Sequence, residues 1–119
     1  WYRLAPAAFI GGSLVAHGGQ NPLEPARLGC AVVHGPHMEN FAEIAAALAG
    51  AGAVRAVRHG AELSAAMAEL LFADTGLRQG LAERARAAVA EADGALDRVM
   101  EALVPFLDPL APRKLSSAA

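Results

Sequence analysis

The sequence predicts an α/β fold in which short parallel strands alternate with helices and the C-terminal part is helical. Three apolar runs, at residues 7–11, 30–33 and 53–57, have the length and composition of buried strands. The segments between these runs carry helix signals, and helical spacing of apolar residues continues from residue 60 onward. Strands separated by helices form a parallel sheet with right-handed crossovers.

The composition is that of one soluble globular domain. The chain has 119 residues, 55% of them hydrophobic, and a formal net charge of -2. Basic and acidic residues are nearly balanced and form no long run, which excludes the electrostatic footprint of a nucleic-acid-binding protein. The longest uncharged apolar stretch, residues 44–54, is much shorter than the roughly 20 residues of a membrane span. The single cysteine, Cys30, cannot form an internal disulfide, which favours a reducing compartment such as the cytoplasm.

The first predicted unit is strand, glycine loop, helix and strand. The strand at 7–11 ends in glycines, and the loop that follows it contains Gly18 and Gly19 and shows no period of its own. Asn21 is suited to cap a helix at 22–28, because a proline follows it at the first helical position. A glycine at residue 29 ends that helix, and the next strand is closed by a Gly-Pro pair.

The remaining elements repeat the alternation before the chain becomes helical. A helix at 39–51 precedes the third strand, and the helices from residue 60 onward have predicted breaks at 74–76 and 93–94. Residues 108–119 are predicted to be a flexible tail behind a domain of residues 1–107.

The N-terminal residues suggest an excerpt of a longer protein. Residues 1–6 have the pattern of the end of a helix already under way, and three strands are too few for an independent sheet covered on both faces. We therefore expect further strands upstream. Without them the sheet keeps an open edge, and this edge together with an apolar interdomain face should favour self-association.

Glycines and polar residues cluster where the predicted strands end, which is where open α/β sheets bind their ligands. The glycine loop and the helix start at Asn21 offer backbone N–H groups to an anion, so phosphate is the expected ligand. Glu24 lies three residues after Asn21, and two interpretations of it stay open. Its carboxylate could accept hydrogen bonds from a ribose diol, or it could complete a capping box with Asn21.

The histidines do not predict a metal site. The intervals between His17, His34 and His37 match no standard zinc spacing, and the chain has no paired cysteines. Neutral hydrogen bonding to phosphate or sugar oxygens suits His17 and His37, whereas His34 and His59 are interpreted as ordinary residues of a strand end or loop.

The same residues resemble the signature block of the 3-deoxy-D-manno-octulosonic acid (Kdo) transferases of lipopolysaccharide biosynthesis. The resemblance rests on residues 11–15, 17–26 and 35–41, which read GGSLV, HGGQNPLEPA and GPHMENF. Gln20 stands where many relatives carry histidine, and Met38 stands where threonine is frequent. These departures bear on individual donor contacts and not on the class of enzyme.

The resemblance implies the Rossmann-like, donor-binding C-terminal domain of a GT-B glycosyltransferase with a truncated parallel sheet. Such enzymes transfer Kdo from CMP-Kdo to a lipid A precursor, with inversion and without an essential metal or cofactor. The family pattern assigns the phosphate to the two glycine-rich turns, the ribose to Asn21 and Glu24, and the nearby cleft to His37 and Asn40. The expected donor-binding residues are Gly11, Gly12, Ser13, His17, Gly18, Gly19, Asn21, Glu24, His37 and Asn40.

The resemblance places the catalytic carboxylate base and the acceptor surface in an N-terminal half that this sequence does not contain. It therefore implies no catalytic residue here and no activity of the chain alone. It also implies membrane association through the other half, at the cytoplasmic face of the bacterial inner membrane. Two alternatives stay open: a nucleotide-binding or interaction module that performs no transfer, and another GT-B transferase that uses a UDP-sugar.

Overall fold

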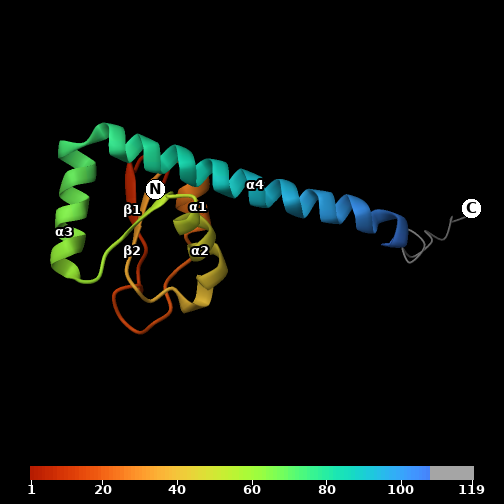
Figure 1. Cartoon of the computed structure of the whole chain (residues 1–119), viewed down its shortest axis with the longest axis horizontal. Helices are drawn as coiled ribbons and strands as arrows, with labels where there is room; N and C mark the ends of the chain where they lie inside the picture. Colours follow the sequence, from red (N-terminus) through yellow and green to blue (C-terminus); the bar gives the residue numbers. More distant parts are fainter. Residues whose placement is uncertain (108–119) are drawn as a thin grey trace, which may run out of the picture.

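A three-stranded parallel sheet forms the centre of the molecule (Figure 1). The computed structural model describes residues 1–107, and the predicted tail at 108–119 lies outside the described residues. The strands are β1 (Ala7–Phe9), β2 (Ala31–His34) and β3 (Val54–Ala56), in the order β1-β2-β3. The helical segments are α1 (Leu23–Arg27), η1 (Glu39–Phe41), α2 (Ala42–Gly50), α3 (Gly60–Ala68), η2 (Glu69–Ala73) and α4 (Thr75–Leu107). The predicted α/β class and its alternation of strands and helices are confirmed.

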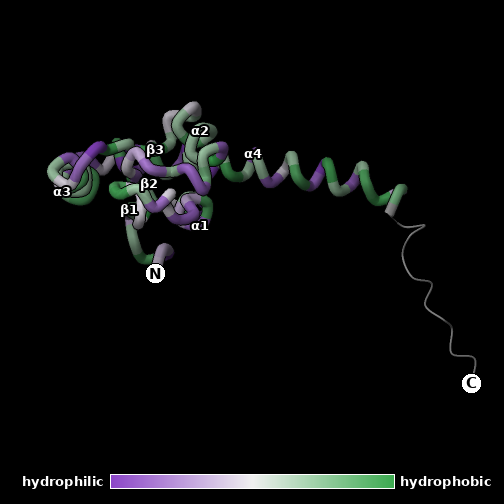
Figure 2. Tube along the Cα trace, turned by 90° about the horizontal axis from the view of Figure 1, so that it is seen from below, coloured by the Kyte–Doolittle hydropathy of each residue, from purple (hydrophilic) through white to green (hydrophobic). Residues whose placement is uncertain are grey.

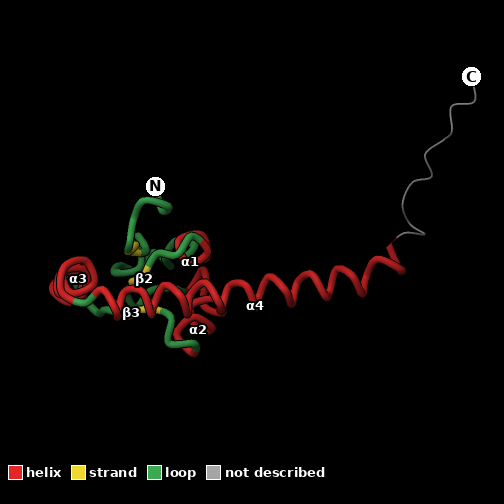
Figure 3. The backbone as a smooth tube through the Cα atoms, turned by 90° about the horizontal axis from the view of Figure 1, so that it is seen from above, coloured by secondary structure: helices red, strands yellow, loops and turns green. Residues whose placement is uncertain are grey.

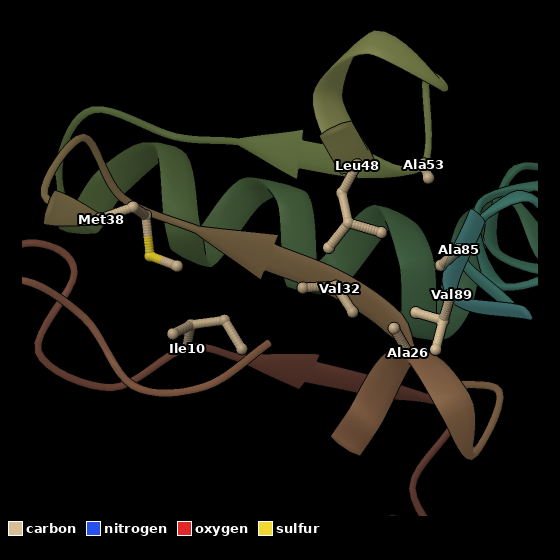
Figure 4. Close-up of a cluster of buried hydrophobic side chains, with 8 residues drawn as sticks. All are labelled: Ile10, Ala26, Val32, Met38, Leu48, Ala53, Ala85 and Val89. Atoms are coloured by element: carbon tan, nitrogen blue, oxygen red, sulfur yellow. The ribbon is translucent and has the colours of Figure 1, made fainter. Parts of the chain in front are cut away.

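The central strand β2 explains why helices pack on both faces of the sheet. Its side chains alternate between two buried clusters, with Val32 in one and Ala31 and Val33 in the other. Helices α1 and α2 contribute to the cluster of Val32, and α3 contributes to the other. Figure 4 shows Leu48 of α2 and Val89 of α4 around Val32. A strand buried on both faces reads as an unbroken apolar run, which is why the sequence predicted it.

The long helix α4 crosses the sheet near the ends where the strands begin and then extends beyond the sheet and the helices packed on it (Figures 1 and 3). Leu81 and Val89 are buried where α4 passes the sheet, whereas Leu96 and Leu103 farther along are exposed. Within the described residues, no helix combines the length and the apolar character that crossing a bilayer requires.

The predicted break at 93–94 is wrong, because α4 is continuous from Thr75 to Leu107. A glycine inside a helix costs about 1 kcal/mol relative to alanine, which is too little to end a helix among good helix formers. In addition, Asp93 holds this turn against α1, since Arg27 Nη2 lies 2.9 Å from both of its carboxylate oxygens. The break near residue 74 is confirmed, because Asp74 Oδ1 accepts the N–H of Leu77 at 2.7 Å and caps α4.

Residues 1–6 form hydrogen-bonded turns instead of the end of a helix. The Leu4 N–H donates to the Trp1 carbonyl at 2.9 Å, and the Ala5 N–H donates to the Tyr2 carbonyl at 3.3 Å. These bonds span three residues and not four. The helical conformation is disfavoured at Ala5 because a proline follows it.

Helix α3 begins with a set of charged contacts around Glu62. The Nδ1 atom of His59 accepts the N–H of Glu62 at 3.4 Å. The Glu62 carboxylate accepts the backbone N–H of Arg58 at 2.7 Å and the Nε–H of the same residue at 2.8 Å. These bonds from Arg58, the side-chain ones above all, lower the pKa of Glu62 from 4.5 to about 2.

We predict that the Glu62 carboxylate stabilises the fold at neutral pH and not in strong acid. Because its folded pKa is depressed, the stabilisation is present above the unfolded pKa of 4.5 and is lost as the pH falls toward 2. A Glu62→Gln variant should melt slightly below the wild type at neutral pH, with a small difference because the pair is exposed. The two circular dichroism melting curves should converge near pH 2. A difference that persists there would contradict the assignment.

Candidate functional site

Two loops meet at the carboxyl ends of β1 and β2, at the end of the sheet away from α4 (Figure 1). We call them the glycine loop (residues 11–21) and the second loop (residues 35–41). Because β1 and β2 are parallel neighbours, the loops that follow them leave the sheet side by side. Apart from Glu24, which lies on α1, every donor-binding residue expected from the resemblance lies in one of these loops.

Ser13 joins the two loops through buried hydrogen bonds. Its hydroxyl donates to the Ile10 carbonyl at 2.5 Å and accepts the N–H of Gly35 at 2.8 Å. Its carbonyl oxygen accepts the N–H of His37 at 2.9 Å. The side chain of Ser13 is fully buried. The hydroxyl is therefore occupied within the protein, and Ser13 presents no free side-chain group to a ligand.

Asn40 holds the far side of the glycine loop. Its backbone N–H donates to the Gly18 carbonyl at 3.0 Å, and its Nδ2 donates to the His17 carbonyl at 3.2 Å. The carboxamide lies so close to Gly18 that a Cβ atom there would be 2.5 Å from Nδ2. With a φ of +88°, Gly18 also has a backbone conformation that side chains disfavour.

Gly19 and Met38 form a second contact between the loops. A Cβ atom on Gly19 would lie 2.6 Å from the Met38 sulfur, and Met38 is itself buried in the core (Figure 4). The neck of the loop is closed by the Gly19 N–H, which donates to the Gly12 carbonyl at 3.2 Å, and by the Gln20 N–H, which donates to the Gly11 carbonyl at 3.1 Å. Contacts within the chain therefore define the shape of the glycine loop.

Asn21 caps α1, but Glu24 does not complete a capping box. Asn21 Oδ1 accepts the N–H of Leu23 at 3.0 Å. Within residues 1–107, the exposed Glu24 carboxylate accepts no hydrogen bond, so the bond back to the Asn21 N–H that a capping box requires is not made. The carboxylate keeps its capacity to accept hydrogen bonds. Because α1 has five residues, its dipole is small, and the case for phosphate rests on the loop.

The histidines have separate environments. His17 is exposed, and His37 Nδ1 lies 3.2 Å from Glu39 Oε1. The backbone N–H of Glu39 and the His37 ring lower the pKa of Glu39. His34 Nδ1 lies 2.7 Å from the Gly35 carbonyl, which can accept but not donate, so Nδ1 carries the proton. Across the part of the chain that the structure describes, no three His, Cys, Asp or Glu side chains gather to hold a metal ion.

Two supporting residues were missed by sequence reasoning. Gly35 allows the close approach of the loops, since a Cβ atom there would lie 2.2 Å from the Ser13 carbonyl oxygen. The sulfur of Met38 packs against Gly19, where it leaves no space for a Cβ atom. The available signals were a glycine directly after a strand and a single apolar residue inside a polar segment.

A groove of about 650 Å³ opens beside the second loop, between α2 and the start of α3. Its lining includes His34, Glu39 and Arg58 together with alanines of α2. No residue of the glycine loop lines it. The groove is therefore separate from the surface that the glycine loop presents.

Comparisons with known proteins agree with the resemblance in the sequence. No family model matches the chain. It is 36% identical over 107 residues to the 3-deoxy-D-manno-octulosonic acid transferase of Haemophilus influenzae and 38% identical over 108 residues to that of Bordetella pertussis. Each match covers 90% of this chain and 25% of the relative. The chain thus spans about a quarter of the length of these relatives.

A solved structure is similar in both sequence and fold. The crystal structure of the C-terminal CMP-Kdo binding domain of WaaA from Acinetobacter baumannii matches with a TM-score of 0.67 and 30% identity. The match covers 75% of this chain and 46% of that chain. The resemblance to the C-terminal part of a Kdo transferase is therefore confirmed.

Proposed function

We propose that this chain is the donor-binding part of a Kdo transferase and binds CMP-Kdo at the glycine loop. The observation that carries the proposal is the glycine loop itself, which hydrogen bonds from the second loop fix at the carboxyl ends of the strands. The similarity to a CMP-Kdo binding domain supports the choice of ligand. A loop that already has its shape loses little conformational entropy when a ligand binds, which favours affinity.

In this proposal the backbone contacts the phosphate and side chains contact the ribose. The turn at residues 11–13 and the N–H of Gly18 face the phosphate. Asn21 and Glu24 approach the ribose, where a carboxylate without other partners can accept two hydroxyl donors. His37, in the second loop, lies beside the glycine loop, and the exposed His17 is part of the glycine loop itself.

The activity proposed for the longer protein is transfer of Kdo to a lipid A precursor. We assign to it the GT-B architecture, inversion at the anomeric carbon, and a location at the cytoplasmic face of the inner membrane. The acceptor contacts, the membrane association and the catalytic base are assigned to the part of the relatives that this chain does not cover. No residue of this chain is assigned as catalytic, and no metal or cofactor is assigned.

We predict that the chain binds CMP, and that Glu24→Gln weakens binding by about tenfold to a hundredfold. Glutamine has the same size, but it loses the charge that strengthens hydrogen bonds from two hydroxyls. Calorimetric titration with CMP measures the effect. The matched control is Glu83→Gln, an exposed carboxylate on α4 that should leave the affinity unchanged.

Titration with UMP tests the alternatives in the same experiment. Tighter binding of UMP than of CMP would favour a transferase that uses a UDP-sugar. Wild-type affinity for CMP in Glu24→Gln would show that the ribose contact belongs to another residue. If neither nucleotide binds, the donor-binding proposal is wrong.

We predict that the chain by itself transfers no Kdo. General-base catalysis needs a carboxylate positioned at the acceptor hydroxyl. Near the loops, Glu39 is bonded to His37, and Glu24 is assigned to the ribose. Incubating the purified chain with CMP-Kdo and a lipid A precursor should yield no Kdo-modified lipid by mass spectrometry. Turnover above a boiled control would contradict the prediction.

We further propose that the chain, when alone in solution, self-associates through the protruding half of α4. Leu96 and Leu103 are 61% and 43% exposed, and Val99 and Phe106 are 54% and 72% exposed. Their seven-residue spacing continues from the buried Val89 and is the pattern of a coiled-coil seam, and Figure 2 shows hydrophobic turns along this half. In a solution of this chain alone, a second copy is the apolar partner that can cover the seam.

Sedimentation equilibrium at micromolar concentration should therefore show a dimer. Leu103→Gln should shift the chain toward monomer, because glutamine keeps the helix propensity and removes apolar surface from the seam. The control is Glu101→Gln, on the opposite side of the helix, which should leave the dimer unchanged. A wild-type chain that stays monomeric at every concentration would rule out this association.

A further inference from the structure

We propose that Asn40 is a positioning residue that orients the Gly18 N–H toward the donor phosphate. The inference rests on the proposed function and deepens it. It names the atom that contacts the phosphate and the side chain that holds this atom in place. Asn40 acts from behind the loop in this assignment and does not itself bond to the phosphate.

Asn40 fixes the orientation of the peptide group between His17 and Gly18. Asn40 Nδ2 donates to the His17 carbonyl at 3.2 Å, which fixes the direction of that carbonyl. In a trans peptide the C=O and the following N–H point in opposite directions. The Gly18 N–H belongs to the same peptide and is therefore turned away from Asn40.

The backbone N–H groups of Gly18 and Gly19 differ in their hydrogen bonding. Gly18 is buried, and within residues 1–107 its N–H has no hydrogen-bond acceptor. Folded proteins leave few backbone N–H groups without a protein, water or ligand partner. The neighbouring Gly19 N–H, in contrast, is occupied by the Gly12 carbonyl at 3.2 Å. Gly18 therefore offers a donor that an anionic oxygen would satisfy, and Gly19 does not.

The packing of Asn40 shows why this residue holds the peptide firmly. Its backbone N–H also bonds the Gly18 carbonyl at 3.0 Å, so both carbonyls that flank the Gly18 amide are held by one residue. The carboxamide occupies the space of a Gly18 side chain, with Cγ 2.6 Å from the position of a Cβ atom. Rotation of the His17–Gly18 peptide would break the bond from Nδ2, and the bond to the Gly18 carbonyl holds the next peptide in place.

The test compares ligands with and without phosphate on the whole chain. We expect Asn40→Ala to weaken CMP binding by about threefold to tenfold, on the scale of one lost hydrogen bond, and to leave cytidine binding unchanged. Asn40→Asp should behave in the same direction, because its carboxylate cannot donate to the His17 carbonyl. Glu43→Ala is the control, since it truncates an exposed side chain on α2, outside both loops, and should leave CMP binding unchanged.

Amide NMR separates positioning from direct contact. In the wild type, inorganic phosphate and CMP should each shift the Gly18 amide resonance, and cytidine should not. In Asn40→Ala without ligand, the Gly18 amide should already exchange faster with solvent, as expected if Asn40 holds the peptide. Unchanged exchange together with weaker CMP binding would make Asn40 a direct ligand and overturn the proposal.

Failure of the proposed function gives a different pattern. If CMP does not bind, but inorganic phosphate shifts the Gly18 amide in the wild type and not in Asn40→Ala, the positioning role stands and the nucleotide assignment falls. If phosphate leaves the Gly18 resonance unmoved in the wild type, the Gly18 assignment is wrong. Equal losses of CMP and cytidine affinity in Asn40→Ala would also overturn it.

Discussion

The buried hydroxyl of Ser13 joins the two loops on which the site depends. It donates to the Ile10 carbonyl, where β1 has just ended, and accepts the Gly35 N–H, where β2 has just ended. Leaving either backbone group without a partner in the interior would cost about 1–3 kcal/mol, so the bond pair sets the separation of the loops. The contacts of Asn40 with the His17 and Gly18 carbonyls form at the same separation. Glycine at residue 35 permits this close approach of the loops, because any side chain there would collide with the Ser13 backbone.

The long helix α4 packs near the ends where the strands begin, whereas the proposed donor site lies at the carboxyl ends of the strands. The strands have three or four residues each, so helices on both faces and α4 near the strand starts supply much of the buried surface. The carboxyl ends of β1 and β2 lead into the two loops, and open α/β sheets bind their ligands at the carboxyl ends of their strands. Met38 links the two regions, because its side chain belongs to the core and its sulfur packs against Gly19 (Figure 4). The shape of the glycine loop is thereby tied to the packing of the core.

Sequence reasoning succeeded where the signal is local and failed where it is long-range. The alternation of strands and helices was predictable because short apolar runs and helical spacing are properties of neighbouring residues. The cap at Asn21 was predictable for the same reason. The break at 93–94 was predicted from a local turn signal, but contact of Asp93 with Arg27 and good helix formers on both sides keep α4 continuous. The bond from Asn40 to His17 joins residues 23 positions apart, and no local sequence pattern predicts it.

The way in which the proposed site would hold a phosphate depends on the positively charged side chains near the glycine loop. Three arginines around the sheet are committed to carboxylates, in the pairs Arg27–Asp93, Arg55–Glu69 and Arg58–Glu62. The glycine loop itself contains no arginine or lysine. In the proposed donor complex the glycine loop therefore contacts the phosphate through backbone N–H dipoles, which act over short distances and in fixed directions, so that a small rotation of one peptide would remove the interaction. For that reason the residues that hold the loop, and not only those that touch the ligand, should determine its affinity.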